Sequence, residues 1–126
     1  MKKVCVTVVL GLVAVAFSMQ SAKALPPFNK EWVAKYVEGN SNAGFLAAAE
    51  EQKCNVCHIG KSKKDHNRYG VELKKLLNKT DDKENVAKIQ AALDTVAAIK
   101  VGDSTYGELI NSGELPGGNP PVPPAE

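Results

Sequence analysis

One short motif, Cys54-Asn55-Val56-Cys57-His58, constrains what this chain can fold around more than any other feature of its sequence. The two cysteines are three residues apart, which is close to one helical turn, and a histidine follows the second. A pair of this kind forms a disulfide, a redox couple, a metal site or a haem attachment site. The rest of the sequence has to decide between these four.

The first 24 residues have the pattern of a secretory signal peptide. Lys2 and Lys3 give a positive start, an apolar run covers residues 4–17, and Ala22-Lys23-Ala24 supplies the small residues that signal peptidase recognises. We expect cleavage after Ala24 and a periplasmic protein; the alternative is an uncleaved N-terminal anchor. The apolar run is shorter than the roughly 20 residues of a membrane span. No stable span is therefore expected once the signal is removed.

Cleavage changes both the cysteine count and the charge. Cys5 leaves with the signal, so the mature chain keeps Cys54 and Cys57 alone. Three lysines leave as well, and 13 basic residues then face 14 acidic ones. A nucleic-acid-binding domain needs a basic surplus, so we expect no nucleic-acid partner.

The mature chain has the sequence pattern of an all-α domain. Apolar residues at helical spacing predict five helices, over residues 29–38, 45–52, 69–77, 81–99 and 106–110. Asn29 is the expected cap of the first helix, and Asp81 with Glu84 forms an expected capping box for the fourth. Asp103 or Ser104 is expected to begin the last one. No alternating strand pattern of useful length is present.

The chain divides into three parts on this basis: the signal over residues 1–24, a helical domain over 25–115, and a tail over 116–126. The tail reads Pro-Gly-Gly-Asn-Pro-Pro-Val-Pro-Pro-Ala-Glu. Proline removes backbone donors and breaks helices and sheet interiors, so the tail is predicted to be extended and mobile.

The helical context favours haem attachment over the other readings of the motif. A thioredoxin-like disulfide needs a βαβ pattern, which is missing. A zinc site would need Cys54, Cys57 and two histidines, and the neighbours Cys57 and His58 are awkward joint ligands of one tetrahedral ion. Cys-x-x-Cys-His is the attachment signature of c-type haem. Two thiols one turn apart can add to the two vinyl groups on one porphyrin edge, and the next residue can reach the iron.

With this motif in a short, exported, helical chain, the protein resembles the monohaem c-type cytochromes of bacterial periplasms. The resemblance implies a small cytochrome c-like helical domain wrapped round one covalently attached haem c, with one haem edge exposed. It gives Cys54 and Cys57 the attachment role and makes His58 the proximal iron ligand. In such proteins the second ring nitrogen of this histidine commonly donates to a backbone carbonyl.

The distal ligand departs from the familiar pattern. Many c-type cytochromes use a methionine there, but Met1 and Met19 are the only methionines and both leave with the signal. His66 is the candidate in its place. Only seven residues separate it from His58, which favours a loop on the proximal side, so a solvated histidine or one near a propionate is the alternative. Lysine, asparagine or tyrosine side chains, water or an empty position also remain open.

Two sets of residues are expected around the haem. The first is the apolar core and pocket wall: Trp32, Tyr36, Phe45, Tyr69, Tyr106, Leu73, Leu76, Leu77, Leu93 and Val96. The second is a basic cluster after the motif: Lys61, Lys63, Lys64, Arg68, Lys74, Lys75 and Lys79. This cluster is a solvated surface, a docking site for an acidic redox partner, or a source of partners for the haem propionates.

These features predict a periplasmic electron-transfer protein and not an enzyme. No Ser-His-Asp set, paired-carboxylate motif or phosphate-binding loop is visible in the sequence. The main alternative is a haem protein with an open or weakly held sixth position that senses a small gas or reacts with peroxide. A third possibility is a haem domain whose role is set by a bound partner.

Overall fold

The computed structural model describes residues 26–126, so the predicted signal peptide lies outside the described residues. About half of the described residues are helical and the strands are very short, which confirms a mostly helical fold. The elements are α1 (Pro27–Tyr36), α2 (Ala43–Gln52), a 3-10 turn η1 (Lys53–Val56), β1 (His58–Ile59), β2 (Asp65–His66), α3 (Arg68–Leu76), α4 (Val86–Ala97), β3 (Lys100–Val101), β4 (Ser104–Thr105) and α5 (Tyr106–Asn111).

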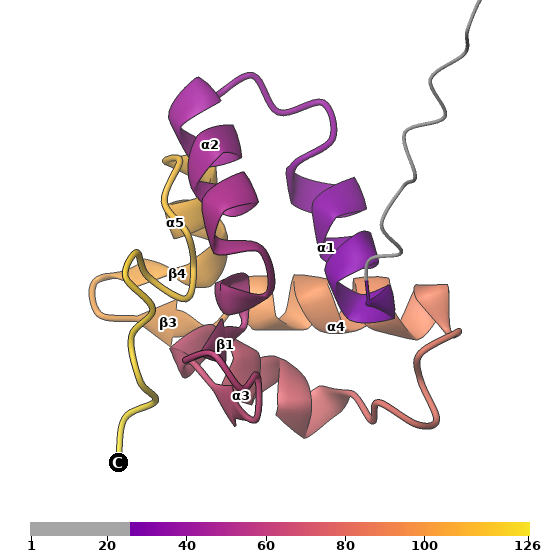
Figure 1. Cartoon of the computed structure of the whole chain (residues 1–126). Coiled ribbons are helices and arrows are strands. Elements are labelled where there is room, and N and C mark those ends of the chain that lie inside the picture. Colours follow the sequence, from indigo (N-terminus) through magenta and orange to yellow (C-terminus); the bar gives the residue numbers. More distant parts are fainter. Residues whose placement is uncertain (1–25) are drawn as a thin grey trace, which may run out of the picture.

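Helix α4 is the helix on which the others assemble. It packs against α1, α3 and α5, and Figure 1 shows it running horizontally with α1 above it and α3 below it. Its apolar stripe supplies Ile89, Ala92, Leu93 and Val96 to the core. The largest fully buried side chains beside this stripe are Trp32, Phe45, Val56 and Tyr69.

The helices begin at capping residues that satisfy free backbone N–H groups. Asn42, Asn67 and Asn85 cap α2, α3 and α4, and Thr105 forms a capping box with Glu108 at α5. The expected caps at Asn29, Asp81 and Asp103 or Ser104 are therefore wrong. At α1 a proline at the first helical position starts the helix before Asn29, because its fixed φ already suits a helix.

Two ribbons of paired two-residue strands lie between the helices and were not expected. In the first, His58 pairs with His66 and Ile59 with Asp65. In the second, Lys100 pairs with Thr105 and Val101 with Ser104. Such pairs are too short to leave an alternating pattern in the sequence.

The C-terminal residues differ from the expected mobile tail. Leu115, Pro116 and Gly117 are buried, and the Val122 N–H donates to the Gly117 carbonyl at 2.8 Å. Figure 1 shows this segment running down beside α2 and β1. Pro116 lacks an N–H group, but its carbonyl accepts from Arg68 Nε at 3.0 Å, and the Val122 carbonyl accepts from the Arg68 backbone N–H at 2.8 Å. The packed domain therefore extends past residue 115, as far as Val122.

Within residues 26–126, no helix is both long and apolar enough to cross a membrane.

Candidate functional site

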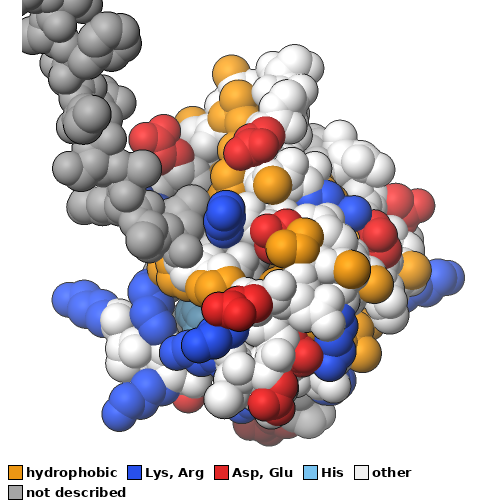
Figure 2. All heavy atoms as spheres, turned by 90° about the vertical axis from the view of Figure 1, so that its right-hand side faces the viewer, with side chains coloured by type: hydrophobic (Ala, Val, Ile, Leu, Met, Phe, Trp, Pro, Cys, Tyr) orange, Lys and Arg blue, Asp and Glu red, His pale blue; other side chains and the backbone are white. Residues whose placement is uncertain are grey.

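A cavity of about 810 Å³ opens between α1, α3, the first part of α4 and the Cys-x-x-Cys-His motif. Cys54, Cys57 and His58 all border it, so the structure brings the three predicted site residues to one place. Figure 2 shows a histidine in a hollow with basic side chains gathered around it, and the basic residues that border the cavity besides the histidines are lysines. Its apolar wall is formed by Phe28, Trp32, Leu73, Leu77, Ile89 and Leu93.

The motif is positioned by the end of α2. Lys53 ends this helix with a φ of +49°, in the left-handed region, and begins the tight turn η1. Cys54 lies on η1, and the Cys57 N–H donates to the Cys54 carbonyl at 3.2 Å. The two thiols therefore stand one turn apart, and both are free. Burial, and secondarily Cys54, raises the pKa of the Cys57 thiol to about 12.

The ribbon β1–β2 holds His58. Its Nδ1 lies 3.2 Å from the carbonyl oxygen of Asp65. A carbonyl only accepts hydrogen bonds, so Nδ1 carries the proton in this contact. In the neutral ring with this tautomer, Nε2 is the nitrogen that is available to bind a metal ion. Asp65 thus supplies a backbone carbonyl of the kind that the resemblance implies.

His66 lies beside His58 and not across the cavity from it. The two are paired in the ribbon, and their ring centroids are 4.5 Å apart at an interplanar angle of 39°. Rings at this separation are in direct contact, so a porphyrin cannot lie between them. In this arrangement His66 cannot bind the opposite face of a haem held by His58. Burial, followed by His58 and Lys74, lowers the pKa of His66.

The mouth of the cavity is basic. The lysines that border it are Lys63, Lys74, Lys75, Lys79, Lys83 and Lys88, which we call the lysine rim. Lys83 and Lys88 were missed, because only the turn between α3 and α4 brings them to the mouth. Lys61 and Lys64 do not border the cavity. Arg68 turns away, since its Nε donates to the Pro116 carbonyl at 3.0 Å.

The turn at this mouth is fixed by one buried carboxylate. Asp82 is 5% exposed and accepts from the Asn78 backbone N–H at 2.7 Å. It also accepts from Lys88 Nζ at 2.8 Å. These two donors, the Asn78 N–H first, lower the pKa of Asp82. Asp82 is the one acidic residue among the described residues that line the cavity.

The predicted wall residues separate into two groups. Trp32, Leu73, Leu76, Leu77 and Leu93 border the cavity. Tyr36, Phe45, Tyr69, Tyr106 and Val96 do not, and they belong to the core and its edge. The Trp32 indole N–H and the Tyr69 hydroxyl are both buried without a hydrogen-bond partner among the described residues, which costs free energy.

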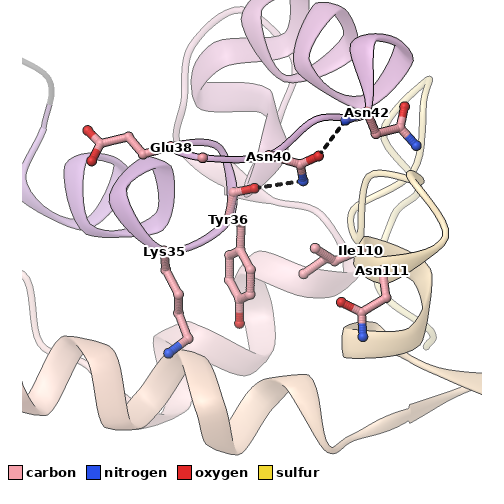
Figure 3. Close-up of a pocket in the computed structure, with 8 residues that line it drawn as sticks. Lys35, Tyr36, Glu38, Asn40, Asn42, Ile110 and Asn111 are labelled. Atoms are coloured by element: carbon pink, nitrogen blue, oxygen red, sulfur yellow. Dashed lines mark hydrogen bonds between the residues drawn. The ribbon is translucent and has the colours of Figure 1, made fainter.

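A second, polar hollow of about 270 Å³ lies where α1 meets the α2 cap and α5 (Figure 3). Asn40 joins its two sides, donating to the Tyr36 carbonyl and accepting from the Asn42 N–H. Burial, followed by Asp94, raises the pKa of Tyr36 to about 12. None of its lining residues is a cysteine or a histidine. The described cysteines and histidines border the larger cavity instead.

The residues at the larger cavity fit a c-type haem. Two free thiols one turn apart and an imidazole with an available Nε2 border one apolar cavity. Among residues 26–126, no three His, Cys, Asp or Glu side chains form a group that could hold a metal ion. Comparison with known protein families, curated proteins and solved structures found no match for this chain. Its function is therefore inferred from its own residues.

Proposed function

We propose that this chain is a periplasmic electron-transfer protein that carries one haem c on Cys54 and Cys57. The observation that supports it most is the shared cavity of the two free thiols and His58, with His58 Nδ1 held by the Asp65 carbonyl. When bound, a haem would supply an iron centre that takes up and releases one electron.

Different residues of the chain would attach the haem, bind its iron and exclude water from it. The two cysteines fix the group covalently at one edge, and His58 binds iron through Nε2. The carbonyl of Asp65 keeps the His58 ring in the required tautomer and orientation. Trp32, Leu73, Ile89 and Leu93 exclude water, which lowers the local dielectric and helps to set the reduction potential.

The lysine rim would serve as the docking surface for an acidic redox partner. Six lysines and one carboxylate border the mouth, and this carboxylate is already paired with Lys88. Such a surface attracts an acidic protein and increases the encounter rate, an effect that salt weakens. The rim also offers partners for the haem propionates. No nucleic-acid partner and no catalytic role are proposed.

One observation favours a second candidate, a haem protein that binds a small gas or reacts with peroxide. Residues 26–126 contain no methionine, and His66 lies against His58. The other possible iron ligands that line the cavity are the lysine Nζ atoms at the mouth and the carboxamide oxygens of Asn29 and Asn78. An open or weakly held sixth position is consistent with this set.

The first experiment is an absorption spectrum of the protein produced with a c-type maturation system. Oxidised and reduced samples are compared with and without carbon monoxide. A sharp low-spin reduced spectrum that carbon monoxide leaves unchanged supports electron transfer, whereas a high-spin spectrum that shifts supports the second candidate. The matched control replaces both Cys54 and Cys57 with serine and should carry no haem that survives denaturation.

The same preparation tests the location. The mass of the mature chain should correspond to cleavage after Ala24, and the protein should be released with the periplasmic fraction. A mature chain that still carries residues 1–24 and stays with the membrane would support the anchor instead.

A further inference from the structure

Asn67 is buried completely, directly behind the attachment motif (residues 54–58). Its side-chain Nδ2 donates to the carbonyls of Asn55 and Val56, each at 2.9 Å, and lies 3.4 Å from that of His58. Its backbone N–H donates to the Cys57 carbonyl at 3.0 Å. The carbonyls of four consecutive motif residues therefore converge on this single residue.

The other side of the same carboxamide begins α3. The Oδ1 of Asn67 accepts from the backbone N–H groups of Tyr69 at 3.1 Å and Gly70 at 2.9 Å. Gly70 in turn packs so closely on the motif that a Cβ there would overlap the Cys57 carbonyl. One side chain thus ties the motif to the helix that forms part of the cavity wall.

The C-terminal segment, residues 115–122, covers Asn67 from behind. A Cβ at Gly117 would overlap Nδ2 of Asn67 and lie 2.6 Å from the Val56 carbonyl oxygen. The segment is held on α3 by Arg68, whose backbone N–H donates to the Val122 carbonyl at 2.8 Å. Asn67 is fully buried, so water cannot replace its side-chain amide as the donor to the buried Val56 carbonyl.

We propose that Asn67 is the positioning residue of the attachment motif. It fixes the backbone that carries Cys54, Cys57 and His58, and the C-terminal segment seals this arrangement. Asparagine suits the place because one side chain both donates to the motif and accepts from α3. The inference rests on the proposed haem function, and it extends the site to residues that do not border the cavity.

Asn67→Asp is the sharpest test, because it changes little except the donor. The carboxylate still caps α3, but it faces the Asn55 and Val56 carbonyls without a proton to donate. Asn42→Asp and Asn85→Asp are matched controls, since both residues cap helices through Oδ1 from exposed positions. There an aspartate keeps the cap and adds a favourable charge at a helix N-terminus.

We expect Asn67→Asp to lower the yield of covalently loaded protein about tenfold, the effect of one unsatisfied buried group. In the fraction that is loaded, the reduction potential and the iron–histidine vibrational band should shift at a temperature where circular dichroism shows the protein to be folded. The two control variants should match the wild type in yield, potential and vibrational band.

If the aspartate variant does not accumulate, the same measurements are made on Asn67→Ser. Serine can cap α3, but its side chain is too short to reach both the Asn55 and the Val56 carbonyl. A lower melting temperature with unchanged yield, potential and vibrational band would overturn the proposal and leave Asn67 a structural residue. A wild type without haem would overturn the proposed function itself. A loaded wild type with variants that match it would overturn only this inference.

Discussion

The back of the cavity and its mouth are held by different forces. At the back, the attachment motif, the start of α3 and residues 115–122 are joined by buried and half-buried hydrogen bonds of 2.8–3.1 Å and by glycines that allow close backbone approach. At the mouth, exposed lysines surround an apolar wall, and the one buried charge is Asp82. The back is therefore held by directional contacts, whereas the lysines at the mouth are exposed to solvent.

This difference assigns separate tasks to the two sides. Hydrogen bonds are directional, so they determine where the thiols and the imidazole lie. Burial of apolar surface has no direction. Trp32, Ile89 and Leu93 in the walls are already buried, whereas Phe28 and Leu76 stay partly exposed at the cavity, where a large apolar group would cover them. The back should therefore tolerate substitution poorly, and the mouth should depend on the cofactor.

The largest effect is expected from removing the cofactor. A variant with Cys54→Ser, Cys57→Ser and His58→Ala cannot be loaded, so the apolar walls face an open cavity of about 810 Å³. We expect a large loss of helical signal and of cooperative unfolding, measured by circular dichroism against the loaded protein. Near-native helicity without haem would show that the walls of α1 and α4 are stable on their own.

The next effect is at the back, at Gly70. Gly70→Ala places a Cβ against the backbone carbonyl of Cys57, which cannot move without shifting the motif. We expect a loss of roughly 3 kcal/mol in the free energy of unfolding, measured by chemical denaturation of the loaded protein.

Gly44→Ala is the control for this substitution. Gly44 also lies in a helix, and the nearest atom to an added Cβ is 3.4 Å away, an ordinary contact. Alanine is the better helix former by up to about 1 kcal/mol, so this variant should be equal to the wild type or more stable. Equal stability of the two alanine variants would show that α3 and the motif are not closely packed.

The sequence predicted the parts of this molecule that depend on periodicity and on a contiguous motif. The apolar stripe of α4 was sufficient to predict that helix, and the contiguous motif was sufficient to expect Cys54, Cys57 and His58 in one place, where the structure has them bordering one cavity. Helix starts were less predictable, because Asp81 and Asn85 are both good caps and the choice depends on the buried pairing of Asp82 with Lys88.

The features that the sequence did not predict depend on contacts between residues that are distant in the chain. Asn67 looks like an ordinary cap, since the carbonyls that it meets lie 9 to 12 residues earlier. The Pro-rich C-terminal segment has no periodic signal, yet its carbonyls find donors on Arg68. The sequence alone allowed His66 to lie on either face of a bound haem. The strand pairing that puts it against His58 is seen only in the structure.

At the mouth, we expect replacement of Asp82 to have a smaller effect on stability, and this effect should depend on pH. Its pKa is lowered in the folded state from 3.8, so its contribution to stability is present above this pH and is lost as the pH falls through the lowered value. Asp82→Asn should melt below the wild type at pH 7, and the difference should shrink towards pH 3. Asp81→Asn, next to it and exposed, should melt with the wild type at both pH values. A difference that does not change with pH would mean that packing, and not charge, fixes the turn.

The smallest effect on stability, and the clearest on rate, is expected at the lysine rim. Lys79→Glu and Lys83→Glu change exposed side chains, so the free energy of unfolding should change by less than about 0.5 kcal/mol. Electron transfer to an acidic partner at low salt should slow by about tenfold, because steering by opposite charge is lost. The electron-transfer rate is measured by stopped-flow absorbance at increasing salt concentrations.

The matched controls for the rim are Lys30→Glu and Lys100→Glu, which make the same change of net charge at exposed residues that do not border the cavity. If the rim is the docking surface, the two rim variants are slower than the controls at low salt, and all four rates converge as salt screens the charges. If all four variants slow equally, net charge alone guides the encounter. A rate that does not depend on salt would leave the lysines as a solvated surface and would remove the reason to assign a partner to the mouth.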